Sequence, residues 1–221
     1  MKNSANKKIL LVFTALFILI FNSCLGLSMD IQLNKNGSGK LTIEYKISNM
    51  LGGLGTLDGN EKWPSVPVGR SDWERTIQRI NGAKLSSFSL NKNDQDNIIK
   101  VTIDFDNPEA LLTLIDPSGG GSSINMNGEF NIFLDMSDSS DDNSQYADIM
   151  PLVSSVFAPY NFSVSFSAPS NSTLTLTDAD GKVFSAPSSA QIIGSGKKVS
   201  LTMGMKEFLE IPNSLVFRFN W

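Results

Sequence analysis

Residues 29–47 read MDIQLNKNGSGKLTIEYKI, and this stretch decides the expected fold. Apolar side chains alternate with polar ones before the centre (Met29, Ile31, Leu33) and again after it (Leu41, Ile43, Tyr45, Ile47). The central residues 36–39, Asn-Gly-Ser-Gly, tolerate the positive φ angles of a tight turn. Period-two alternation on both sides of such a turn predicts an antiparallel hairpin with one apolar face.

The same alternation predicts most of the remaining chain. Strands are expected at 83–91, 98–106, 130–136, 160–166, 174–176, 199–203 and 215–221, and helices at 72–81, from Pro108 to 115, at 146–157 and at 205–210. Residues 49–70 hold five glycines and two prolines without periodicity, which predicts a long loop. The expected fold class is α+β, an antiparallel sheet built from hairpins with two or three helices packed on one face.

The first 23 residues have the layout of a secretory signal peptide. Lys2, Lys7 and Lys8 form a basic start, and an apolar run of 13 residues follows from Ile9 to Phe21, interrupted only by Thr14. That run is shorter than the roughly 20 residues that span a bilayer as a helix. We therefore expect a signal peptide at 1–23 and a mature domain at 24–221, with the change of pattern near 159 as the place where it could divide.

Cys24 directly follows this segment and is the one cysteine of the chain. A single thiol cannot form an intramolecular disulfide. Phe21-Asn22-Ser23-Cys24 resembles the relaxed lipoprotein signal of spirochaetes and some other diderm bacteria. The resemblance implies cleavage before Cys24 and a lipid anchor of two or three acyl chains, such as palmitate, enough for stable attachment. Leu25 and Gly26 lack the aspartate of inner-membrane retention, so the resemblance favours the outer membrane over the inner.

The charge balance restricts the classes of partner. The chain has 18 basic and 22 acidic residues, and removal of the three signal-peptide lysines leaves 15 against 22, a formal charge of −7. This balance argues against binding to nucleic acid, which needs clustered lysine and arginine. It also argues against electrostatic docking on anionic lipid. The expected membrane partner is therefore reached through the lipid on Cys24.

The sequence offers little for catalysis, and no cofactor is expected. It has no histidine, which removes Ser-His-Asp and Cys-His pairs and imidazole zinc sites. The stretches 37–42 and 194–198 have superficial phosphate-loop character but lack its spacing and its following helix, so each is interpreted as a hairpin turn. Residues 178–181 resemble the start of a calcium loop, yet Ser189 stands where its last carboxylate belongs, so a turn is again expected.

One dense group of carboxylates is a weak calcium candidate. Asp135, Asp138, Asp141 and Asp142 lie in a serine-rich stretch, and calcium prefers six to eight oxygen ligands. The alternative interpretation is a solvated acidic loop, and no metal site is predicted outright.

The stretch 30–42 is similar to the first hairpin of LppM-like bacterial lipoproteins, a likeness that extends over about residues 29–106 through a hairpin, a long loop and a helix. The resemblance implies an envelope protein that binds lipid and carries over no functional residue. Leu51, Leu54, Leu57 and Trp63 would form the apolar lip of such a site, or would simply cover the core. We therefore expect a non-enzymatic binding or scaffolding module of the cell envelope, with an apolar ligand or an envelope protein as partner. The alternative is a carboxylate-pair hydrolase.

Overall fold

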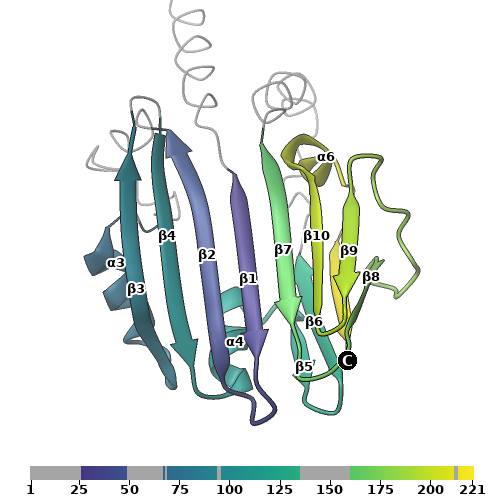
Figure 1. Ribbon diagram of the computed structural model, residues 1–221, viewed down its shortest axis with the longest axis horizontal. Coiled ribbons are helices and arrows are strands. Elements are labelled where there is room, and N and C mark those ends of the chain that lie inside the picture. Colours follow the sequence, from purple (N-terminus) through teal and green to yellow (C-terminus); the bar gives the residue numbers. More distant parts are fainter. Residues whose placement is uncertain (1–25, 49–66, 68, 94–95, 135–159, 212–213) are drawn as a thin grey trace, which may run out of the picture.

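A computed structural model describes residues 26–48, 67, 69–93, 96–134, 160–211 and 214–221 (Figure 1). Strands hold 51% of these residues and helices 14%. The described fold is two stacked sheets with three short helices. The prediction of an α+β fold, with helices packed on one face of a single antiparallel sheet, is therefore wrong.

The larger sheet has seven strands in the order β3-β4-β2-β1-β7-β10-β9. The strands are β1 (Leu27–Leu33), β2 (Gly39–Ser48), β3 (Ala83–Lys92), β4 (Asp96–Phe105), β7 (Asn161–Ser167), β9 (Gln191–Ser195) and β10 (Lys198–Gly204). All neighbours are antiparallel except β1 and β7, which run parallel and join the two halves of the chain. The expected hairpins at 29–47 and 83–106 are both confirmed.

The first hairpin closes as its residues predict. Leu33 pairs with Gly39, and Asn34 both donates to Ser38 (N to O, 2.8 Å) and accepts from Gly37 (N to O, 3.0 Å). Gly37 has a φ of 83°, a conformation that costs a residue with a side chain free energy. A Cβ added at Gly39 would lie 1.9 Å from the Gln32 carbonyl oxygen, so this position excludes a side chain.

The smaller sheet has four antiparallel strands in the order β5-β6-β11-β8. They are β5 (Ser123–Asn125), β6 (Glu129–Leu134), β8 (Thr173–Thr177) and β11 (Leu215–Asn220). Figure 1 shows this sheet behind the β7–β10 half of the larger one.

An aromatic layer fills the space between the two sheets. Ring centroids are 4.9 Å apart for Phe166 and Phe219, 5.4 Å for Phe130 and Phe166, and 5.6 Å for Phe162 and Phe217. These phenylalanines are at most 1% exposed. Burial of such rings is the main driving force that holds the sheets together.

The helices cover the other half of the larger sheet and one of its ends. Helix α3 (Arg70–Ile77) packs on β3, and α4 (Pro108–Ile115) lies between β4 and β5. Asn107 caps α4 by accepting a hydrogen bond from Ala110 N at 2.8 Å, and Pro108 occupies the first turn, as expected. Helix α6 (Met205–Leu209) follows β10 directly. The helix expected at 146–157 lies outside the described residues.

The last strand gives the physical reason why the α+β prediction is wrong. Leu215, Val216 and Phe217 are all buried, since β11 is a central strand of the second sheet rather than the edge of the first. Alternation indicates which residues of a strand face inward but not which sheet the strand joins.

None of the helices in the described part of the chain has the length and hydropathy needed to span a membrane.

Candidate binding site on the polar face

The seven-stranded sheet has one face turned away from the smaller sheet (Figure 1), and strand β7 places serines on that face. Its β7 residues are Ser163, Ser165 and Ser167, which alternate with buried Phe162, Val164 and Phe166. One cross-strand row runs through Ser87, Thr102, Thr42, Asp30, Ser165, Ser200 and Ile193. The face is therefore rich in hydroxyl groups; we call it the polar face.

Three carboxylates of the polar face each pair with a lysine. Lys198 Nζ lies 2.6 Å from Asp30, Lys100 Nζ lies 3.4 Å from Glu44, and Lys40 contacts Asp104. The hydrogen bond from Lys40 is the main reason that the pKa of Asp104 lies below its ordinary value. Such exposed pairs contribute only about 0–1 kcal/mol each to stability. Their consequence here is that each carboxylate is matched by a neighbouring cation.

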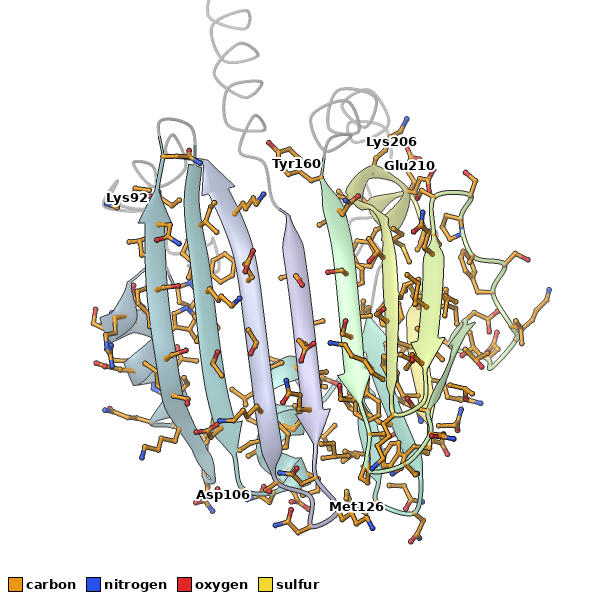
Figure 2. All side chains as sticks on the ribbon, viewed as in Figure 1. Lys92, Asp106, Met126, Tyr160, Lys206 and Glu210 are labelled. Carbon is orange, nitrogen blue, oxygen red and sulfur yellow. The ribbon has the colours of Figure 1, made fainter. Side chains whose placement is uncertain are left out.

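A pocket of about 430 Å³ lies at one end of the polar face, where β7 begins and β10 ends. We call it the α6 pocket. The side chains that line it are Asn161 from β7, Gln191 from β9, Thr202 from β10, Lys206 and Glu207 from α6, and Ser189 from the loop that precedes β9. Figure 2 shows Lys206 on α6 and Glu210 directly after this helix at the same end, with Tyr160 directly before β7. The volume falls in the range of small-molecule sites.

Hydrogen bonds fix one wall of the α6 pocket. The Glu207 carboxylate accepts from Ser189 N at 3.1 Å, from the Ser189 hydroxyl and from Ser188 Oγ at 3.4 Å. Ser189 Oγ in turn accepts from Gly204 N at 3.0 Å. The Ser189 hydroxyl bond is the largest cause of a Glu207 pKa below the ordinary value. Glu207 therefore stays ionised and holds the loop against α6.

Three exposed polar side chains line the pocket. Asn161, Gln191 and Thr202 make no side-chain hydrogen bond to any part of the chain that the structure describes. Met203 is 1% exposed and points into the core, so it borders the pocket through its backbone. The pocket thus presents amides, a hydroxyl, one cation and one anion, a set suited to binding a polar molecule.

The α6 pocket lies at the end of the sheet where β1 starts, which we call the Gly26 end. Leu27 pairs with Tyr45 on one side and with Phe162 on the other, so Gly26 is level with Lys46 and Asn161. Lys46 N donates to Gly26 O at 3.1 Å. Tyr45 donates through its hydroxyl to the Pro67 carbonyl at the same end.

The site residues proposed from the sequence lie outside the described residues. These are Cys24, the apolar residues Leu51, Leu54, Leu57 and Trp63, and the calcium candidates Asp135, Asp138, Asp141 and Asp142. Within the described ranges, no three Cys, Asp or Glu side chains are grouped to hold a metal ion.

The turns expected in place of phosphate and calcium loops are confirmed. Residues 195–198 form the β9–β10 turn, with Ser195 paired to Lys198. Gly181 N donates to Asp178 O at 3.1 Å, and Asp178 Oδ1 accepts from Lys182 N at 2.8 Å. The Asp178 carboxylate is therefore used within its own turn.

Sequence reasoning missed the α6 pocket. Asn161, Gln191, Thr202 and Lys206 come from three strands and a helix, and only the pairing of β7, β10 and β9 brings them together. Comparison of the chain with protein-family models, curated proteins and solved structures gives no match. The functional conclusion therefore rests on the geometry of the molecule.

Proposed function

We propose that the chain is a lipid-anchored protein of the cell envelope that acts as a binding or scaffolding module. The observation that carries this proposal is the arrangement at the Gly26 end, where a polar pocket lies beside the strand that directly follows the lipoprotein signal. The proposed anchor is Cys24, in the outer membrane rather than the inner one.

The distance from the proposed anchor to the folded domain is short. Gly26 is hydrogen bonded to Lys46 at the start of β1, and Leu25 alone separates it from Cys24. Because a residue extends the chain by at most about 3.6 Å, Cys24 lies within about 7 Å of Gly26. On this proposal, the Gly26 end faces the bilayer and the polar face stands upright from it.

Binding is favoured over hydrolysis by the state of the carboxylates. A carboxylate-pair hydrolase needs two carboxyl groups about 5–10 Å apart in one cleft, one of which is protonated. The α6 pocket has Glu207 as its carboxylate, and the serine hydrogen bonds lower its pKa. On the polar face Asp30, Glu44 and Asp104 each pair with a lysine. These groups suit recognition better than proton transfer.

An apolar or lipid ligand is part of the proposal through residues 49–66. The residues that flank this segment, Ser48 in β2 and Pro67 beside Tyr45, both belong to the Gly26 end. The segment that contains Leu51, Leu54, Leu57 and Trp63 therefore connects two residues of the end that would face the membrane. Mass analysis of lipids that co-purify with the protein tests this part, and a protein purified without lipid would count against it.

The anchor is tested by the Cys24→Ala substitution in the native cell. We expect the variant to leave the membrane fraction and to lack the acylated N-terminal peptide in mass spectrometry, because the acyl chains supply the attachment. Ser23→Ala is the matched control, since it keeps a small residue before the cysteine and should stay anchored. Density-gradient separation of the membranes tests the outer-membrane location. Undiminished membrane retention of Cys24→Ala would contradict the anchor.

A further inference from the structure

We infer that the α6 pocket binds a neutral saccharide. The inference rests on the proposed binding function and deepens it by assigning a ligand class to the pocket. Asn161, Gln191 and Thr202 converge on the pocket from three adjacent strands, and none spends its side-chain hydrogen bonds on the described residues. All three residues are exposed, so water satisfies their polar groups in the free protein, and a ligand would bind by replacing that water.

The hydrogen-bonding groups match those of a sugar. An amide side chain offers both donors and an acceptor, and a hydroxyl offers one donor and two acceptor sites. Each sugar hydroxyl likewise donates and accepts, so two amides and a hydroxyl can bind several of them at once. Gly204 pairs with Asn161 at the floor of the pocket and, with no side chain, leaves the space open.

The local charges disfavour an anion. Lys206 is the cation of the pocket, but Glu207 lines the same pocket and Glu210 lies 4.0 Å from the Lys206 ammonium. The two carboxylates outweigh the lysine, so a phosphate or a carboxylate ligand would meet no net positive charge. A neutral ligand avoids this cost.

The apolar surface near the pocket is small, which suits the C–H face of a sugar better than a lipid tail. Among the described residues, no apolar side chain lines the α6 pocket, since Met203 points into the core. Ile193 lies two residues from Gln191 on the same face of β9, about 7 Å along the strand, and is 62% exposed. One aliphatic side chain beside a cluster of polar groups suits an amphipathic ring and is too small for an acyl chain.

The test uses the full mature protein with its anchor, held in micelles of a detergent without a sugar headgroup. Saturation-transfer difference NMR would measure binding of maltose, cellobiose and N,N′-diacetylchitobiose, with inorganic phosphate and triglycine as competing classes. We expect at least one disaccharide to bind saturably at a single site. Longer oligomers of that sugar would show whether a polymer or a free sugar is the tighter ligand.

Variants assign the binding to the α6 pocket. Asn161→Ala and Gln191→Ala should each weaken binding about three- to tenfold, the loss expected for one or two neutral hydrogen bonds. Gly204→Val should abolish binding, since even a Cβ at this position lies 3.4 Å from Ser189 Oγ and the larger side chain would occupy the pocket. Asn91→Ala is the matched control: it changes an exposed asparagine of the polar face on the opposite edge strand, β3, and should bind as wild type.

Several outcomes would overturn the inference. The first is that no saccharide shows a saturation-transfer signal. The second is that saccharide binding survives Gly204→Val in a folded protein. The third is that phosphate or triglycine displaces the bound saccharide at a lower concentration than a competing sugar does. Circular dichroism of each variant shows whether it is folded. The lipid anchor is tested independently of saccharide binding. Membrane retention of Cys24→Ala would refute the anchor, and saccharide binding could still be measured in the same protein.

Discussion

Removal of the Tyr45 hydroxyl should loosen the Gly26 end without unfolding the domain. Tyr45 is 4% exposed, and its hydroxyl accepts from Trp73 Nε1 at 3.0 Å and donates to the Pro67 carbonyl. It thereby joins β2, α3 and the residue that follows segment 49–66. Tyr45→Phe keeps the ring but leaves a buried indole N–H and a carbonyl without their partner.

The expected cost follows from those two groups. An unsatisfied buried polar group costs about 1–3 kcal/mol. Trp73 is 8% exposed, so its N–H bears this cost, whereas Pro67 is only half-buried and water can replace its partner. We therefore expect Tyr45→Phe to lower the free energy of unfolding by about 2 kcal/mol, measured by urea denaturation and far-ultraviolet circular dichroism. A change below about 0.5 kcal/mol, the range of neutral surface substitutions, would refute the reasoning.

The same residue predicts a pH dependence. Burial raises the pKa of Tyr45 from 10.0 to about 12. Between these values the unfolded chain has lost the phenolic proton and the folded protein retains it, so this contribution to stability is complete below pH 10 and is lost as the pH rises toward 12. At 1.36 kcal/mol per pKa unit, the loss is about 3 kcal/mol. Tyr45→Phe should remove this component, whereas Tyr160→Phe, which keeps Tyr45, should preserve it.

Three further predictions concern stability and are each measured by denaturant unfolding. Phe166→Ala should cost about 3–5 kcal/mol, because the ring is fully buried and contacts both sheets, and a loss below 1 kcal/mol would contradict the interlocked core. Backbone hydrogen bonds from Gly120 and Ser122 lower the pKa of Asp116 to about 2. The ionised Asp116 therefore contributes to the free energy of unfolding above pH 4, and this contribution is lost as the pH falls toward 2. Asp116→Asn should flatten the dependence of the free energy of unfolding on pH in this range. Gly128→Ala should destabilise more than Gly119→Ala, since a Cβ at 128 would lie 2.4 Å from Trp221 O and one at 119 meets nothing within 4 Å; equal losses would count against this register.

The local structure was largely predictable from the sequence. Alternation located the β1–β2 and β3–β4 hairpins, and Asn107-Pro108 marked the start of α4, since each of these signals depends on neighbours in the chain. The two phosphate-loop-like stretches were correctly interpreted as turns, because the residues around them alternate as strands. Short-range patterns report backbone conformation and the inward face of an element.

The assembly of those elements was not predictable. Leu27 pairs in parallel with Phe162, far away in the sequence, and nothing local distinguishes that pairing from an antiparallel neighbour. The division into two sheets is likewise a property of the whole core: Phe217 and Phe219 form a second layer by packing against Phe162 and Phe166. The three described helices are short, so they could not form the layer that the α+β prediction required.

The same parallel pairing explains why the candidate site lies where it does. Because β7 runs parallel to β1, both strands start at the Gly26 end, and Asn161 at the head of β7 is level with Gly26. β10 returns antiparallel to β7, so it ends there and passes directly into α6. An antiparallel β7 would have placed the α6 pocket at the opposite end of the sheet, away from the proposed anchor. If Cys24 is the lipid anchor, as we propose, the pocket would be held close to the bilayer surface, and a saccharide attached to the envelope would then be favoured over one that diffuses freely.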